Sequence, residues 1–327
     1  MRKIYKRVEP IFFIVKTPLH MGCGSELGLV DQPIQREKHT SFPKIEASSI
    51  KGTLRHEFRG IISKYDLEVL FGPEKSDEAS DRASSLSISD GRLLLFPVKS
   101  AKGVFAWITS PKVLSQFYSD LKLCIPDINL PEESLKSLLL KHNKVPQNTN
   151  LFVKDGIILL EEYAFKNVAE DSNLGELTSW ISRNLIPNGL EYDYIKEKIT
   201  RDIILLSDDD FHDFVNLSTE VITRTNIDPE TGTVKSGALF TEEYLPVETI
   251  MYSLVMASPL FGTNEQNINY DSFEEVKNEN GDIQAQKIIS HFNVNCPKIL
   301  QMGGNATTGK GLINIHLLTE NEEDDKQ

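Results

Sequence analysis

Two residues near the amino terminus could carry out metal or proton chemistry. His20 and Asp31 flank the glycine-bearing stretch MGCGSELGLV. An aspartate beside a scissile phosphate can hold a divalent cation or take a proton, and such residues usually lie on loops of a rigid scaffold. An aspartate close to a proline is also a common turn former. The residue types alone therefore leave both a catalytic site and an ordinary turn open.

A basic stripe is expected shortly after Asp31. If the segment from Ile50 is a helix, three cations spaced by four residues share one face: Lys51, Arg55 and Arg59. Cations near a helix start oppose the helix dipole unless an anion binds, so the stripe is either an anion-binding surface or a solvated face. Gly52 in the first turn costs about 1 kcal/mol relative to alanine, which suggests that a backbone or a ligand approaches there.

Residues 303–311, GGNATTGKG, nearly match the phosphate-binding pattern G-x-x-x-x-G-K-[ST]. Gly311 replaces the hydroxyl residue that would bind magnesium, and the following LINIHLL alternates like a strand instead of forming the required helix. A nucleotide triphosphatase is therefore disfavoured. What remains is either a turn between two strands or a loop whose N–H groups and side chains bind an anion. The residues concerned are Gly303, Gly304, Thr307, Thr308, Gly309 and Lys310.

Residues 216–245 predict a long β-hairpin, because two β-rich polar arms flank the turn sequence DPETG. The arms carry few large apolar residues, so we expect the hairpin to project towards a partner rather than pack on the core. Glu242 and Tyr244 share one face of the second arm, where they could orient a substrate or simply decorate an exposed strand. The aspartates at 208–210 are more typical of a solvated or capping run than of a metal site.

The composition is that of a globular protein: 327 residues, 39% hydrophobic and 25% charged. No apolar run approaches the roughly 18 residues of a membrane helix, and the short apolar start favours a first strand over a secretion signal. We therefore expect a cytoplasmic protein with no membrane partner. The three scattered cysteines, Cys23, Cys124 and Cys296, suit reduced thiols.

The net charge of −13 argues against a surface covered with nucleic-acid contacts. Residues 36–59, however, hold six Lys or Arg against three Glu. A narrow basic surface on an acidic body is compatible with this distribution.

The expected elements begin with a strand at 8–16 and a helix from Ile50, capped by Ser48 or Ser49, whose apolar positions continue to Tyr65. Strands at 85–98 and 103–109 and a helix opened by Pro111 follow. Strand, helix, strand, strand, helix is the beginning of a ferredoxin-like βαββαβ unit. Residues 120–210 mix helical patterns with one alternating stretch, and the chain ends as strand, glycine loop, strand and an acidic tail at 320–327.

Four separated segments, in this order, resemble a known family. They are TPLHMGCGSELGLVDQPIQREKHTSFPKIEASSIKGTLR, SISDGRLLLFPVKS with GVFAWITSP, TRTNIDPETGTVKSGALFTEEYLP and LQMGGNATTGKGLI. They resemble the repeat-associated mysterious protein (RAMP) superfamily, and within it the backbone subunits of the type III-B CRISPR–Cas effector, the Cmr complex.

The resemblance implies one α+β RAMP domain over 1–327. Its ferredoxin-like (RRM-type) palm comprises 1–120 and 246–320, with a helical insertion at 120–210 and a projecting thumb hairpin at 216–245. It also implies that copies of the chain polymerise along CRISPR guide RNA with other Cmr subunits. Each thumb would displace a nucleotide of the guide–target duplex, and the chain would cleave target single-stranded RNA at regular intervals as an endoribonuclease with a divalent metal ion of the Mg²⁺ or Mn²⁺ class.

The resemblance also assigns residues. Asp31 corresponds to the cleaving and metal-binding aspartate, and His20, Lys51, Glu242 and Tyr244 correspond to further catalytic positions. The implied RNA-binding residues are Lys51, Arg55, Arg59, Gly303, Gly304, Thr307, Thr308, Gly309 and Lys310. Glu46 departs from the family pattern of proline followed by a small residue, and it adds a negative charge near the expected phosphate site.

Two other functions remain open at this point. One is a non-catalytic scaffold of the same superfamily, which binds guide RNA without cutting. The other is a free-standing nuclease that processes precursor guide RNA. A cleaving subunit would cut target RNA at regular intervals in the presence of metal, whereas the scaffold would not. Activity on precursor RNA without any partner would identify the processing nuclease.

Overall fold

The fold was analysed in a computed structural model that describes residues 5–25, 28–73, 83–236, 238–261 and 271–318. The acidic tail expected at 320–327 lies outside the described residues. Among the described residues, no helix combines the length and the apolar character needed to cross a membrane.

Four antiparallel strands form the centre of the molecule, in the spatial order β15–β1–β13–β4. They are β1 (Arg7–Val15), β4 (Gly91–Lys99), β13 (Ile250–Ala257) and β15 (Leu312–Leu317). β1 is buried from Pro10 to Val15 because both faces of the sheet are covered, which explains why its sequence is a continuous apolar run rather than an alternating one.

Shorter strands extend this sheet on both sides. They are β2 (Lys44–Ile45), β3 (Leu86–Ile88), β5 (Phe105–Thr109), β6 (Lys144–Val145), β9 (Ala169–Glu170), β10 (Ile203–Leu205) and β14 (Ile299–Gln301). The sequence order suggested that the 103–109 strand and the Pro111 helix continue the central unit. The structure instead pairs β5 with the outer side of β4, and the strand between β4 and β1 is β13.

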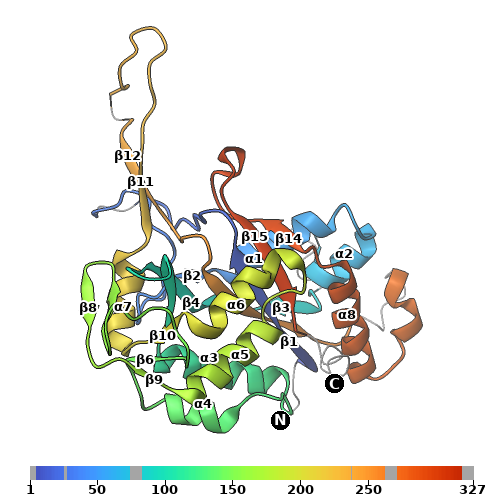
Figure 1. Cartoon of the computed structure of the whole chain (residues 1–327). Helices are drawn as coiled ribbons and strands as arrows, with labels where there is room; N and C mark the ends of the chain where they lie inside the picture. The colour runs from blue at the N-terminus through green and yellow to red at the C-terminus, as the bar shows by residue number, and fades with distance from the viewer. Residues whose placement is uncertain (1–4, 26–27, 74–82, 237, 262–270, 319–327) are drawn as a thin grey trace.

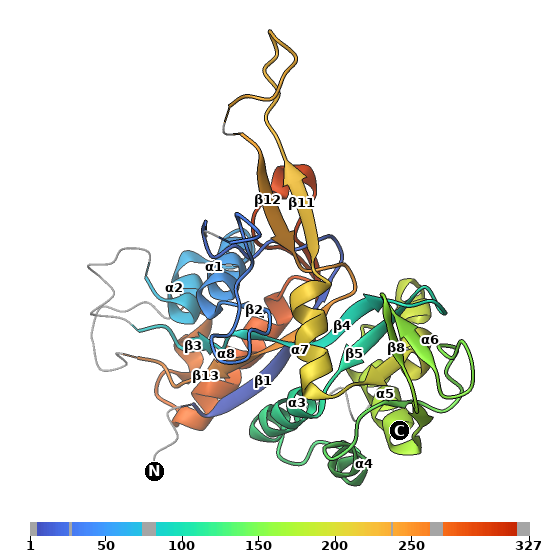
Figure 2. The same ribbon diagram turned by 90° about the vertical axis from the view of Figure 1, so that its left-hand side faces the viewer.

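Helices cover the two faces of the sheet (Figure 2). One side carries α1 (Ala47–Phe58), α2 (Lys64–Phe71) and α8 (Gly281–Asn295), together with the short η2 (Asp271–Val276). The other side carries α3 (Pro111–Cys124), α4 (Glu132–Leu138), α5 (Ser172–Asn184), η1 (Leu190–Tyr192) and α6 (Asp193–Arg201). Residues of both layers belong to one hydrophobic core cluster.

The helix that carries the basic stripe is shorter than its apolar pattern predicted. α1 starts after Glu46, which makes no side-chain capping bond, so the predicted serine cap is wrong. Asp90 accepts a hydrogen bond from the N–H of Ala47 instead. The helix stops at Phe58, and Ser63 caps the separate helix α2. Ile61 therefore lies in an exposed turn rather than on the buried face.

The predicted helical insertion at 120–210 contains strands as well as helices. β6, β9 and β10 add to the main sheet, and β7 (Ile158–Leu160) pairs with β8 (Tyr163–Phe165) in a separate hairpin. The insertion is therefore built onto the edge of the sheet rather than being an independent helical bundle.

A two-stranded ribbon stands clear of the body where the sequence predicted a hairpin (Figure 1). β11 (Glu220–Arg224) and β12 (Phe240–Tyr244) pair in antiparallel register, with Glu220 opposite Tyr244 and Ile222 opposite Glu242. The start of the predicted segment differs, because residues 216 and 217 still belong to α7 (Asp208–Leu217). The aspartates at 208–210 form the first turn of this helix, where Ser207 is the cap.

Candidate active site

Asp31 is fastened to the base of the projecting ribbon. Its Oδ2 accepts hydrogen bonds from the N–H of Thr241 at 2.7 Å and from the Thr241 hydroxyl at 2.9 Å. The next residue, Gln32, pairs with Glu242 in a parallel bridge. These contacts join two segments 210 residues apart in sequence. These contacts hold the loop of Asp31 against the first residues of β12.

The environment of Asp31 favours its charged form. Hydrogen bonds from the backbone and then the side chain of Thr241 hold the pKa of the carboxyl below its ordinary value of 3.8. A carboxylate with a lowered pKa is a weak proton acceptor near neutral pH but a good ligand for a hard cation. Oδ1 takes part in none of the bonds to Thr241, and Asp31 is exposed.

Glu242 and Tyr244 point into a buried polar cluster at the base of the ribbon. The Tyr244 hydroxyl donates to Glu242 Oε2 at 2.6 Å. Arg224, on the facing strand, pairs with the Glu242 carboxylate and donates to the Tyr244 hydroxyl at 2.7 Å. Asn305 of the glycine loop donates to the same hydroxyl at 3.0 Å. The predicted shared face of Glu242 and Tyr244 is confirmed, and the cluster joins the ribbon to the loop.

The cluster also sets the charges of its acidic groups. Burial alone would raise the pKa of Glu242, but hydrogen bonds from Tyr244, Asn305 and Arg224 outweigh it and lower the pKa. Burial, followed by the neighbouring Glu242, raises the pKa of Tyr244. Glu220 lies opposite Tyr244 in the ribbon. Burial raises the pKa of Glu220, although the positive charge of Lys310 acts to lower it.

His20 lies between the ribbon and the glycine loop. Its Nδ1 is 2.7 Å from the backbone carbonyl oxygen of Glu243, and its ring is 5.4 Å from that of Tyr244, centre to centre. The His20 carbonyl accepts the N–H of Gly304. A side chain at residue 303 would put its Cβ 2.4 Å from that carbonyl oxygen, and the backbone there has a φ of +80°. Glycine at 303 is thus required for His20 to be held this closely.

The glycine loop itself connects β14 to β15, as one of the two sequence interpretations predicted. The expectation that its N–H groups stand open as an anion nest is wrong for much of the loop. Five of these groups already donate to backbone carbonyls of the same chain: those of Gly304, Thr308, Gly309, Lys310 and Gly311. Lys310 places its ammonium 5.1 Å from the centre of the Tyr244 ring. An anion would therefore have to bind to the side chains of this loop rather than to these five N–H groups.

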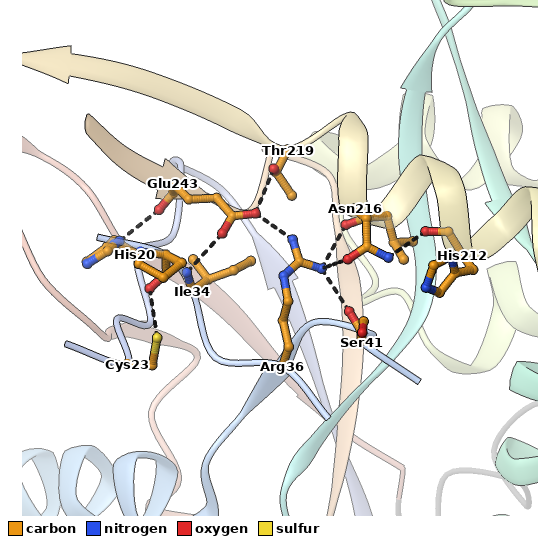
Figure 3. Close-up of polar contacts among 11 residues, drawn as sticks. His20, Cys23, Ile34, Arg36, Ser41, His212, Asn216, Thr219 and Glu243 are labelled. Atoms are coloured by element: carbon orange, nitrogen blue, oxygen red, sulfur yellow. Dashed lines mark hydrogen bonds and ion pairs between the residues drawn. The ribbon is translucent and has the colours of Figure 1, made fainter. Parts of the chain in front are cut away.

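A second cluster supports the opposite face of β12 (Figure 3). The buried Glu243 carboxylate accepts bonds from the Thr219 hydroxyl at 2.7 Å and from the N–H of Ile34 at 3.0 Å, and it pairs with Arg36. Arg36 also donates to Asn216 at 2.9 Å. The ribbon base is therefore held from α7 and from the segment that follows Asp31.

The Lys51 and Arg55 side chains of α1 make the following hydrogen bonds outside this cluster, and Arg59 lies just beyond the end of the helix. Lys51 donates to the Ser84 hydroxyl at 2.6 Å and to the carbonyl of Leu86 at 3.0 Å, and burial, followed by repulsion from Arg55, lowers its pKa. Arg55 donates to the carbonyl of Gly72 at 2.6 Å. Both cations tie α1 to the chain that follows it. Their roles in catalysis or RNA binding, and that of exposed Arg59, stay predictions.

At the start of α1, a Cβ added to Gly52 would meet no atom of the described residues within 4 Å outside its own helix. The close approach of a backbone is therefore not found there among these residues, and the approach of a ligand stays a prediction. Glu46 is paired with Lys44, and its N–H donates to Gln35. Its negative charge is therefore partly neutralised within the chain.

Residues 12–314 match the RAMP superfamily. This chain belongs to the RAMP superfamily. It is 36% identical, over 310 residues that cover 92% of both chains, to the CRISPR system Cmr endoribonuclease Cmr4 of Pyrococcus furiosus. A crystal structure of oligomeric Cmr4 from Pyrococcus furiosus superposes with a TM-score of 0.63 at 27% identity, covering 95% of this chain and 98% of that one. A type III-B Cmr-beta complex bound to cognate target RNA contains a chain of the same fold, with a TM-score of 0.70 at 19% identity, covering 97% of this chain and 99% of that one.

This RAMP chain offers a sparse protein environment for a metal ion. Among the described residues, no group of three or more His, Cys, Asp or Glu could hold one. Mg²⁺ commonly keeps several waters and binds through one or two carboxylates together with substrate phosphates. The ionised Asp31 carboxylate suits that arrangement, in which RNA phosphate oxygens would supply the remaining ligands.

Sequence reasoning on this RAMP chain missed the residues that hold the predicted ones: Arg36, Thr219, Arg224, Thr241, Glu243 and Asn305. Arg224 could have been found, because a hairpin that places Glu242 and Tyr244 on one face also places alternate residues of the facing strand there. Thr241 and Asn305 carried no such signal.

Proposed function

We propose that this chain is a backbone subunit of a type III-B CRISPR RNA-guided effector complex. In this role it binds CRISPR guide RNA, associates with other copies of itself and other Cmr subunits, and cleaves complementary target single-stranded RNA at regular intervals. The similarity to the Pyrococcus furiosus Cmr endoribonuclease supports the reaction class. We expect the chain in the cytoplasm, where such a complex meets its RNA.

The observation that carries this proposal is the attachment of Asp31 to the base of the projecting ribbon through Thr241. An acid fixed at this position would lie beside whatever the ribbon contacts. The ribbon cannot attract RNA along its tip by charge, because the turn carries Asp228 and Glu230 against Lys235. It is better suited to act as a steric wedge.

We assign the central sheet to a ferredoxin-like palm. The order β15–β1–β13–β4 is that of a βαββαβ unit in which α1 and α8 are the two crossover helices. The palm would comprise 1–120 and 246–320, the insertion 120–210 and the thumb 216–245, all within one domain over 1–327. The single hydrophobic core cluster supports this assignment.

The chemistry proposed for the site is largely positional. A 2′-hydroxyl of RNA can attack its own phosphate, but an A-form duplex holds it out of line. A nucleotide displaced by the thumb is released from that restraint, so that in-line attack becomes accessible. The 2′-oxygen then bonds to phosphorus and loses its proton to solvent, while the bond to the 5′-oxygen of the next nucleotide breaks. The products are a 2′,3′-cyclic phosphate and a 5′-hydroxyl that takes a proton from solvent. The protein then needs to fix the strand on either side of the displaced nucleotide and to supply charge at the reacting phosphate.

In this scheme Asp31 would hold a divalent cation of the Mg²⁺ or Mn²⁺ class, which would supply charge neutralisation at the reacting phosphate when bound. His20 and Lys51 position the phosphate, and Glu242 and Tyr244 act from the thumb. The buried bonds of Glu242 and Tyr244 to Arg224 favour an orienting role for this pair over direct proton transfer.

Guide RNA would be gripped along α1 and the glycine loop. We propose that Arg55 and Arg59 contribute charge on α1 and that Thr307, Thr308 and Lys310 contribute side-chain donors. Gly303, Gly304 and Gly309 would allow close approach of the RNA backbone. Thr307 and Thr308 are exposed, which makes them accessible to RNA.

The decisive test replaces Asp31 by Asn in the assembled complex. Asp31→Asn keeps a hydrogen-bond acceptor for Thr241 but removes the charge, so we expect target cleavage to be lost while guide and target binding are retained. Glu230→Gln, an exposed acid on the same hairpin, is the matched control and should cut normally. Full cleavage by Asp31→Asn would contradict the assignment.

A non-catalytic guide-binding scaffold of the same superfamily is the second candidate. Both candidates bind RNA, so binding data do not separate them. Metal-dependent cutting of target RNA at regular intervals does. Cutting of precursor guide RNA by the isolated chain would instead indicate a free-standing processing nuclease.

A further inference from the structure

An open hollow of about 410 Å³ lies between the β7–β8 hairpin and α7, beside the start of the ribbon. Its apolar part is formed by three rings, with Phe214 in contact with both Tyr163 and Phe165 at centroid distances of 5.6 and 5.9 Å. Its carboxylates are Glu161, Glu162, Asp210 and Asp213. We call this hollow the acidic groove.

The chemistry of the acidic groove selects its occupant. None of the described residues that line it is Lys, Arg or His. RNA is disfavoured because its phosphates would face four carboxylates. A polypeptide segment that presents cations around apolar side chains is favoured, since aromatic rings bind both apolar groups and cations. Tyr163 and Leu217 leave 54% and 72% of their surface exposed, so the apolar part is uncovered in the single chain.

A segment of this kind exists on the other side of the same molecule. The turn between α1 and α2 exposes Ile61, at 53%, and the start of α2 exposes Tyr65, at 44%. Arg59 and Lys64 accompany them, and the Lys64 side chain is 76% exposed, with only a long 3.7 Å contact to Glu68. We call residues 59–65 the basic turn.

The two surfaces lie on opposite sides of the body. Figures 1 and 2 both place α2 well away from α7 and β8. The basic turn therefore cannot reach the acidic groove of its own chain, but it can reach that of another copy. We propose that the basic turn of one copy docks in the acidic groove of the next.

This contact is heterologous, so a pair of copies keeps one free groove at one end and one free turn at the other, and further copies can add there. The inference rests on the self-association proposed above and supplies its geometry. Thr219 lines the groove and donates to Glu243 at the ribbon base. A neighbouring copy bound in the groove would thus contact Thr219, which helps to hold the base of the ribbon.

Charge reversal on each surface tests the proposal. The groove variant carries Glu162→Lys and Asp213→Lys, and the turn variant carries Arg59→Glu and Lys64→Glu. The mass of each purified full chain is followed against concentration by sedimentation velocity, without RNA. We expect the wild-type chain to associate and each variant to associate at least about tenfold more weakly, because like charges then meet.

Mixtures make the test specific for a head-to-tail contact. In an equimolar mixture of the two variants, the intact turn meets the intact groove and the reversed turn meets the reversed groove. Association should therefore be restored, with the two variants alternating along assemblies larger than dimers. Both sets of changes on one chain should restore association through reversed ion pairs. Asp209→Lys on α7, outside the groove, and the exposed Lys154→Glu are the controls and should behave as wild type. Circular dichroism establishes that each variant is folded.

Several results would overturn the interface. These are mixtures that associate no better than each variant alone, controls that dissociate as strongly as the variants, or a wild-type chain that stays monomeric both alone and on single-stranded RNA. Loss of cleavage by itself would leave the interface intact, because mass is measured independently of activity. Failure of the interface and failure of the proposed function are therefore distinguishable.

Discussion

Thr241 binds one oxygen of Asp31 with two donors, its backbone N–H at 2.7 Å and its hydroxyl at 2.9 Å. The N–H of Asp31 in turn donates to the Thr241 hydroxyl at 3.0 Å. This reciprocal pair fixes the direction of an exposed carboxylate that would otherwise sample several rotamers. It also attaches that carboxylate to the ribbon rather than to the sheet, so any displacement of the ribbon base is transmitted to Asp31.

Thr241→Val tests whether this orientation matters for cleavage. Valine keeps the shape and the N–H but removes the hydroxyl, so we expect Asp31 to be misdirected and single-turnover cleavage in the assembled complex to fall by roughly ten- to a hundredfold. Thr241→Ser retains the hydroxyl and is the matched control, with a rate close to wild type. Equal rates for the valine and serine variants would remove Thr241 from the site.

The pH dependence of cleavage should reflect the lowered pKa of Asp31. The folded-state pKa lies below the ordinary 3.8, because the Thr241 backbone and side chain stabilise the charge. The contribution of the carboxylate is therefore complete above that value and is lost only as the pH falls through the lowered pKa. Between about pH 7 and pH 5, deprotonation of Asp31 should not limit the rate. Thr241→Val should move the acid limb of the rate profile upwards, and an unmoved limb would assign it to another group.

Gly303 and Gly309 provide a matched pair in the glycine loop. Both have a positive φ, +80° and +75°, but only a Cβ at 303 would collide, at 2.4 Å from the His20 carbonyl oxygen. Gly309→Ala should cost about 1–2 kcal/mol of unfolding free energy from backbone strain. Gly303→Ala adds about 1–3 kcal/mol of overpacking and should also displace His20. Urea denaturation of both variants measures the difference, and equal costs would show that the loop relaxes freely.

The local elements of this chain could be predicted because their signals are local. The helix opened by Pro111, the first strand and the two arms of the ribbon follow from the proline, β-branched runs and turn residues. Where two local signals competed, the prediction failed. The apolar positions that continue past Phe58 suggested one helix, but Gly60 and the Ser63 cap divide it into two.

The site could be predicted only in part, because its bonds cross the whole sequence. Asp31 and Thr241 are 210 residues apart, and His20 and Glu243 are 223 apart. No periodicity relates such positions, and their contact depends on how β13 and β15 flank β1. The family resemblance supplied Asp31, His20, Glu242 and Tyr244 as a set, but it gave no account of the side chains that hold them.

A buried ion pair should control the attachment of the insertion to the sheet. Lys198 and Asp202 are 2% and 3% exposed and 2.6 Å apart, and Lys198 also donates to the carbonyl of Gly103 beside β5. Lys198→Met leaves an unpaired buried carboxylate and should cost about 3–5 kcal/mol of unfolding free energy, whereas Lys198→Met with Asp202→Leu should cost much less. Arg201→Gln breaks an exposed pair with Glu197 and should cost about 0–1 kcal/mol. A double variant as unstable as the single one would show that the pair contributes net stability.

Cys23 provides a chemical probe of the loop between His20 and Asp31. It is exposed, whereas burial raises the pKa of both Cys124 and Cys296 to about 12 and so suppresses their thiolates. Since the thiolate is the reactive form, a thiol reagent should label Cys23 rapidly in the native chain and the other two only after unfolding. Cys23→Ser, which should lack the fast phase, is the control. If target RNA passes along this loop, adding target RNA to the guide-bound complex should slow the labelling of Cys23 severalfold. Unchanged labelling on a complex that demonstrably binds target would place the target strand elsewhere on the surface.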